Sequence, residues 1–139
     1  MGETVALVDY GAGNLHSVEN ALRKVGAQVS VTADPDVLRT ADRIVLPGVG
    51  SFKACAEGLR AQDSAIEAMA ERVRVGGAPF LGICVGMQLL ATRGLEHGPT
   101  AGLDWIAGEV RAIEPIDVSV KVPHMGWNDV ATTPHAKGD

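Results

Sequence analysis

Residues 79–91, PFLGICVGMQLLA, pass from an apolar run into a helical pattern through the turn Gly82-Ile83-Cys84-Val85-Gly86. We expect a strand over Pro79–Ile83, a helix over Met87–Ala91, and Cys84 in the turn between them. This order is typical of a nucleophile elbow, whose glycines let the backbone make a tight, strained turn. The sulfur then projects at a helix N-terminus, which favours the thiolate. The stretch therefore predicts an α/β sheet with Cys84 as candidate nucleophile, the alternative being a buried structural cysteine between turn glycines.

Before this elbow, short apolar runs alternate with helical patterns. The sequence predicts strands over 4–9, 28–31 and 44–46, and helices that begin near Leu15, Ser51 and Ile66. A short turn or helix is expected to open at Asp34. Alternation over about 90 residues predicts an open, mostly parallel sheet with right-handed crossovers. After Gly94 the pattern changes, and we expect strands of a later, antiparallel section over 110–113, 118–122 and 127–130.

Three loops should meet at the carboxyl edge of this sheet, where open α/β sheets carry their sites. They are Tyr10–Asn14, Pro47–Ser51 and Cys84–Gly86. The glycines of Pro47-Gly48-Val49-Gly50 allow backbone amides to face a ligand as an oxyanion hole requires, with the Val85 amide as the second donor. Gln88 follows Cys84 by four residues, so its carboxamide can face the same pocket, although a solvated glutamine is an equal alternative.

Two other features receive a structural interpretation. Gly11-Ala12-Gly13 begins like a dinucleotide fingerprint, but His16 stands where the third glycine belongs, so we expect no nucleotide site. Cys55 lies on an apolar helical stripe with Phe52 and Leu59 and is expected to pack in the core.

Composition limits the function further. The 139 residues are 46% hydrophobic and 21% charged with a net charge of −5, which indicates one globular domain and argues against a basic face for nucleic acid. The sequence offers no apolar run of the roughly 20 residues that would cross a membrane, and its N-terminus is unlike a secretory signal. With only two cysteines, a reducing, cytoplasmic setting is expected. We expect neither a metal site nor a cofactor.

Four motifs of the sequence resemble those of a known enzyme family. Residues 82–88, GICVGMQ, resemble the nucleophile motif of class I, triad-type glutamine amidotransferases. Residues 9–15 (DYGAGNL), 47–52 (PGVGSF) and 122–128 (VPHMGWN) narrow the resemblance to the glutaminase subunits of imidazole glycerol phosphate synthases. It extends from the first strand to about Val130 and implies a flavodoxin-like sheet with helices on both faces.

The resemblance also implies a mechanism. Cys84 would attack the side-chain amide of glutamine, form a thioester and release ammonia, after which water frees glutamate. Gly50 and Val85 would stabilise the oxyanion, after a reorientation of the 47–50 loop, and Gln88 would hold the glutamine. Ammonia would pass to a cyclase subunit, a (β/α)₈ barrel, that makes imidazole glycerol phosphate and an aminoimidazole carboxamide ribotide in histidine biosynthesis. Asn14, His124, Trp127 and Asn128 would meet this cyclase, with Trp127 as an anchor.

One part of the family pattern has no counterpart. The triad needs a histidine and a glutamate, found in a His-Pro-Glu type motif late in such chains, whereas His135 here is followed by Ala136-Lys137. We therefore expect residues 1–139 to form a single amidotransferase domain, incomplete at its C-terminus, that does not turn over glutamine by a full triad. The alternative is a short enzyme that uses His124 or His135. Two other functions stay open: the glutaminase domain of another class I amidotransferase, and a non-catalytic module that binds the cyclase.

Overall fold

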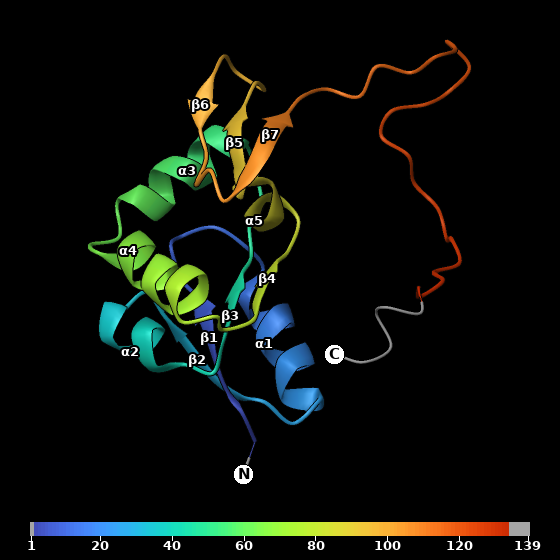
Figure 1. Cartoon of the computed structure of the whole chain (residues 1–139). Helices are drawn as coiled ribbons and strands as arrows, with labels where there is room; N and C mark the ends of the chain where they lie inside the picture. Colours follow the sequence, from blue (N-terminus) through green and yellow to red (C-terminus); the bar gives the residue numbers. More distant parts are fainter. Residues whose placement is uncertain (1, 134–139) are drawn as a thin grey trace.

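Four parallel strands form the main sheet of the molecule (Figure 1). The computed structural model describes residues 2–133. The strands lie in the order β2-β1-β3-β4, with bounds Thr4–Val8 for β1, Gln28–Thr32 for β2, Arg43–Leu46 for β3 and Phe80–Gly82 for β4. This is the beginning of a flavodoxin-like strand order, and it confirms the predicted open parallel sheet.

Helices cover both faces of this sheet. Helix α1 (Leu15–Lys24) packs on the face that carries Val5, Leu7 and Val45. The opposite face receives α2 (Pro35–Thr40), α3 (Phe52–Arg60), and α4 (Ala65–Ala70), which continues into a π-helical turn, η1 (Glu71–Val75). The first βαβ unit therefore places its helix on one face and the next two units place theirs on the other, so both faces are covered as the resemblance implied.

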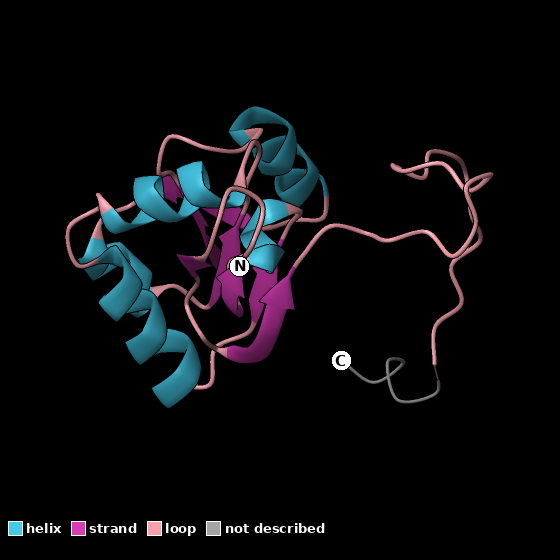
Figure 2. Ribbon diagram, turned by 90° about the horizontal axis from the view of Figure 1, so that it is seen from above, coloured by secondary structure: helices cyan, strands magenta, loops and turns pink. Residues whose placement is uncertain are grey.

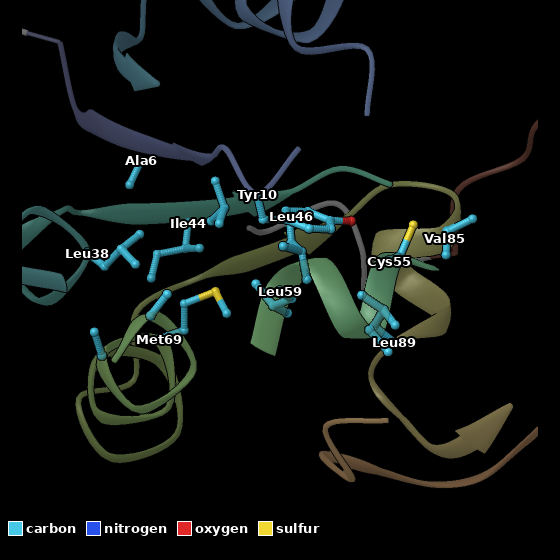
Figure 3. Close-up of a cluster of buried hydrophobic side chains, with 14 of the residues drawn as sticks. Ala6, Tyr10, Leu38, Ile44, Leu46, Cys55, Leu59, Met69, Val85 and Leu89 are labelled. Carbon is cyan, nitrogen blue, oxygen red and sulfur yellow. The ribbon is translucent and has the colours of Figure 1, made fainter. Parts of the chain in front are cut away.

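Strand β1 shows why these residues form a central strand. Val5 and Leu7 are buried against α1, whereas Ala6 and Val8 are buried in the larger cluster on the other face. A strand buried on both faces needs a continuous apolar run, which is what this part of the sequence provides. The larger cluster (Figure 3) also contains Leu46, and each fully buried leucine contributes about 1.5–3 kcal/mol.

Beyond β4 the chain differs from the prediction. The expected helix over Met87–Ala91 is instead a single turn, α5 (Val85–Gln88), followed by β5 (Ala91–Gly94). The physical reason lies at Leu89 and Leu90, whose carbonyl oxygens accept hydrogen bonds from the amides of Leu103 (2.7 Å) and Trp105 (2.9 Å). Because this distant segment takes the carbonyls, the helix stops.

Strand β5 belongs to a second, smaller sheet. The order is β6-β5-β7, with β6 at Thr100–Ala101 and β7 at Ile106–Val110; β6 pairs antiparallel to β5 and β7 pairs parallel. The strand predicted over 110–113 is therefore wrong except at Val110, where β7 ends. The purely antiparallel arrangement expected for this section is also wrong.

Residues 111–133 leave the body of the protein after β7 and run beside it without regular strands (Figures 1 and 2). The strands predicted over 118–122 and 127–130 are absent from this described segment. Alternating apolar residues make a strand only where another strand pairs with them, and here Val118 and Trp127 are fully exposed. No helix within residues 2–133 combines the length and the apolar character that a membrane span requires.

Candidate active site

Cys84 occupies a strained turn at the carboxyl end of β4. Its backbone dihedrals are φ 56° and ψ −119°, a sparsely populated conformation that costs a non-glycine residue on the order of 1–3 kcal/mol. The amides of Met87 and Gln88 donate to its carbonyl oxygen at 3.0 and 3.2 Å and so hold the turn against α5. The side chain is exposed, whereas Val85 is buried beneath it. The strained, solvent-facing turn expected of a nucleophile elbow is therefore present.

Two glycines let the elbow pack against the end of β3. A Cβ on Gly86 would overlap the carbonyl oxygen of Leu46, and a Cβ on Gly48 would lie 2.5 Å from the Gly86 nitrogen. No side chain fits in either place. The loop after β3 and the turn after β4 thus touch through their backbones.

The two predicted oxyanion donors differ in their present hydrogen bonding. The Val85 amide donates to the carbonyl oxygen of Gly48 at 3.3 Å. The Gly50 amide has no protein acceptor within residues 2–133, and Gly50 is in the left-handed region with φ 104°. The Gly50 amide is therefore free to donate a hydrogen bond. The Val85 amide must first give up its bond to Gly48 before it can donate to an oxyanion.

A pocket of about 470 Å³ opens beside the sulfur. Its walls include the predicted site residues Cys84, Gly50, Val85 and Gln88, which come from the loop after β3 and from the elbow with its helical turn α5. The pocket is also lined by residues that the sequence analysis missed: Leu95, Glu96, Val110, Arg111 and Ala112. Among the residues described, no group of three or more histidine, cysteine or acidic side chains is placed to bind a metal ion.

Glu96 is the most informative of the missed residues. Its Oε2 accepts a hydrogen bond of 2.9 Å from the Phe52 amide, one of the unpaired N–H groups at the start of α3. The positive end of that helix favours a carboxylate at this position. The contact spans 44 residues, so no local sequence pattern could have revealed it.

The four residues expected at the partner interface are not brought together. Asn14 is the N-cap of α1, where its side chain accepts from the Ser17 amide at 3.4 Å. His124, Trp127 and Asn128 lie in the 111–133 segment, in which the His124 ring and the Asn128 amide are 3.0 Å apart. Their common role stays a prediction.

None of the histidines within the described residues lines the Cys84 pocket. His16 is on α1, and His97 lies 3.9 Å from Glu96 on the outside of the loop after β5. His124 lies in the 111–133 segment, and His135 falls outside the described residues. The described pocket thus holds a thiol, amide donors and two charged groups.

Comparison with known proteins shows the family of the chain. The model of the family "Glutamine amidotransferase class-I" matches residues 6–134. The chain is 53% identical to the imidazole glycerol phosphate synthase subunit HisH of Caulobacter vibrioides, over 96% of this chain and 66% of that protein.

Two solved structures show the same fold at low identity. A peptidase E-like protein from Listeria monocytogenes EGD-e has a TM-score of 0.56 and 18% identity, with 67% of this chain and 52% of that chain covered. A glutamine amidotransferase has a TM-score of 0.55 and 20% identity, with 70% and 51% covered.

The chain spans between 61% and 66% of the length of eight HisH subunits to which it is 49–54% identical. The family model itself covers nearly all of the described residues, including the elbow and the loop after β3. The chain therefore belongs to the class-I glutamine amidotransferase family.

Proposed function

We propose that this chain is the glutaminase part of an imidazole glycerol phosphate synthase and that Cys84 is its nucleophile. The observation that carries the proposal is the exposed Cys84 sulfur on a strained turn, in one pocket with the free Gly50 amide and the Gln88 side chain. The 53% identity to a HisH subunit supports the choice of this branch of the family.

In the proposed reaction the Cys84 thiolate attacks the side-chain carboxamide carbon of glutamine. The C=O electron pair moves to oxygen, the C–N bond then breaks, and ammonia leaves with a proton supplied by a general acid. Water hydrolyses the resulting thioester to glutamate and the free thiol. The residue that delivers the proton is not among those that line the described pocket.

The oxyanion of this reaction would be bound by backbone amides. Gly50 offers a free N–H at the pocket wall, and the Val85 amide would exchange its bond to Gly48 for one to the oxyanion. Removal of one such donor typically costs about 10²–10³ in rate, so this exchange would have a large effect on catalysis.

The same pocket supports recognition of free glutamine. Glu96 presents a carboxylate for the α-ammonium group, and Arg111 presents a guanidinium for the α-carboxylate. Gln88 contributes a carboxamide near Cys84 for the amide end of the substrate. This charge pattern would distinguish free glutamine from a glutamine side chain within a protein.

Ammonia would pass to a cyclase subunit with a (β/α)₈ barrel, which carries out the ring-forming lyase step of histidine biosynthesis. We propose that Asn14, His124, Trp127 and Asn128 contact this subunit, with Trp127 as the anchor because its side chain is fully exposed. In this proposal a single amidotransferase domain extends over the whole chain, and it works in the cytoplasm.

A diazoketone analogue of glutamine, 6-diazo-5-oxo-L-norleucine, tests this function together with binding of the Caulobacter vibrioides cyclase. We expect one label per chain on Cys84, protection by glutamine, no label on Cys84→Ser, and cyclase binding that weakens in Trp127→Ala. Cyclase binding without any label would favour the non-catalytic module. Labelling without cyclase binding would favour the glutaminase domain of another class-I amidotransferase.

A further inference from the structure

The two charged residues of the Cys84 pocket come from neighbouring strands of the small sheet. Glu96 follows the end of β5, and Arg111 follows the end of β7. Because β5 and β7 pair in parallel (Figure 1), their carboxyl ends meet at one edge, where the Leu95 amide donates to the Val110 carbonyl oxygen at 2.9 Å. The register of this strand pair therefore decides which residues after β7 reach the pocket.

An extra residue in β7 shifts this register by one position. Ala91 pairs with Ile106, whereas Gly94, three residues further along β5, pairs with Val110, four residues further along β7. Such a β-bulge bends a strand and re-aims its side chains, and bulges are common next to active sites. Without the extra residue, Glu109 would stand opposite Gly94.

Packing explains why the shifted register is favoured. A Cβ on Gly94 would lie 2.5 Å from the ring of Phe52, so this part of β5 lies directly on the core. Val110, the partner of Gly94, packs against the same core cluster. In the unshifted register a carboxylate would take this place at a cost in free energy, whereas the bulge leaves Glu109 paired with Arg93.

The hydroxyl of Thr92 holds the bulge from the facing strand. Its oxygen accepts a hydrogen bond from the Gly108 amide at 3.2 Å, and it donates one to Oδ1 of Asp104 at 2.6 Å. The Asp104 amide in turn donates to the Ala91 carbonyl oxygen at 3.1 Å. The hydroxyl therefore joins β5 to both ends of residues 104–108, the segment that contains the extra residue.

We infer that Thr92 is a positioning residue, whose hydroxyl fixes the bulge in β7 and thereby places Arg111 in the pocket that also contains Glu96. This inference rests on the proposed glutaminase function, in which these two charged groups bind the α-groups of glutamine. Thr92 acts through the strand pair, because it is not among the residues that line the pocket.

Protection of Cys84 by glutamine tests this role. Iodoacetamide alkylates the sulfur by displacing iodide, and the measured quantities are the alkylation rate and the glutamine concentration that halves it. Thr92→Val removes the hydroxyl and keeps the shape of the side chain. We expect it to raise the half-protecting concentration about threefold, a partial loss of charged hydrogen bonds, and to leave the alkylation rate without glutamine unchanged.

Three further variants separate positioning from a general loss of stability. Thr92→Ser keeps the hydroxyl and should restore the half-protecting concentration of the wild type. Thr40→Val removes a hydroxyl that bonds within α2, to the Asp36 carbonyl oxygen at 3.0 Å, and should also leave this concentration unchanged. If Thr92→Val does not fold, Asp104→Gly replaces it, because glycine tolerates the φ of 56° and removes only the acceptor of the Thr92 hydroxyl. It should raise the half-protecting concentration as well.

The inference is overturned if the half-protecting concentration of Thr92→Val, or of Asp104→Gly in its place, equals that of the wild type. It is also overturned if Thr92→Ser is as weak as Thr92→Val, or if Thr92→Val alters the alkylation rate in the absence of glutamine. A wild-type protein that glutamine does not protect would refute the proposed function itself, and the inference with it.

Discussion

The amide nitrogen of Val85 lies 3.3 Å from the carbonyl oxygen of Gly48 and donates a hydrogen bond to it. This bond joins the turn that carries Cys84 to the loop that carries Gly50, although the two segments are more than 30 residues apart in sequence. It also occupies an amide that the proposed chemistry needs. The loop therefore holds the elbow in place, and its Gly48 carbonyl also accepts the Val85 hydrogen bond that the oxyanion would need.

Substitution of Gly48 tests this close packing. In Gly48→Ala the added methyl group would lie 2.5 Å from the Gly86 nitrogen and 2.9 Å from the Tyr10 hydroxyl, so the loop must move. We expect a loss of about 1–3 kcal/mol in the free energy of unfolding, measured with urea. Gly126→Ala is the matched control, because its nearest neighbour would be at an ordinary 4.0 Å. Equal stability of the two variants would contradict the packing described.

Gly50 offers a second test, of backbone conformation at the pocket. Gly50→Ala places a side chain at φ 104°, and Gly77→Ala does so at φ 74°; in both cases the methyl group meets no atom within 4 Å. Both should lose about 1 kcal/mol of stability. Only Gly50→Ala should also slow labelling of Cys84 by the diazoketone. A similar effect of both variants on labelling would remove Gly50 from the site.

The charge of Glu96 is tested by an isosteric change. Glu96→Gln keeps an oxygen that can accept from the Phe52 amide but loses the negative charge offered to the α-ammonium group of glutamine. We expect the glutamine concentration that half-protects Cys84 from alkylation to rise about tenfold, the value of one charged hydrogen bond. Glu57→Gln, on the exposed side of α3, is the control, and its half-protecting glutamine concentration should equal that of the wild type. If the half-protecting concentration were unchanged in Glu96→Gln, the Glu96 carboxylate would not bind the α-ammonium group of glutamine.

Asp42 predicts a pH dependence of stability. Its carboxylate accepts from the Thr4 amide (2.8 Å) and the Thr4 hydroxyl (2.7 Å), and these bonds lower its pKa below the usual 3.8. The stabilisation is therefore present above pH 3.8 and is lost as the pH falls through the lower, folded-state pKa. Urea unfolding should show Asp42→Asn less stable than the wild type at neutral pH, with a difference that shrinks in acid. If the difference in the free energy of unfolding stayed constant with pH, the negative charge of Asp42 would not contribute to stability.

Local patterns were enough to predict the main sheet and the elbow. The apolar run of β1 and the glycines around Cys84 are local signals of a buried strand and a tight turn, although Gly86 is required because it packs against the distant Leu46 carbonyl. The three carboxyl-end loops then meet because parallel strands end at one edge of a sheet.

Contacts between distant segments explain the features that sequence reasoning missed. Leu103 and Trp105 end α5 by taking the carbonyls of Leu89 and Leu90, although the helical pattern continues past that point. Glu96 reaches the pocket only because Phe52 begins α3 beside it. Cys55 is buried as predicted, but the hydrogen bond from its thiol to the Val49 carbonyl oxygen was hidden for the same reason, since an apolar helical stripe predicts burial and not what the thiol touches.

The central claim is that Cys84 attacks glutamine, and the most direct measurement traps the product of that attack. The protein, in complex with the cyclase, is mixed with glutamine, quenched in acid and examined by peptide mass spectrometry. The account predicts a glutamyl thioester on the peptide that contains Cys84, release of ammonia in the same burst, and neither in Cys84→Ala. A glutamyl adduct on Cys55, or ammonia released equally by Cys84→Ala, would contradict it.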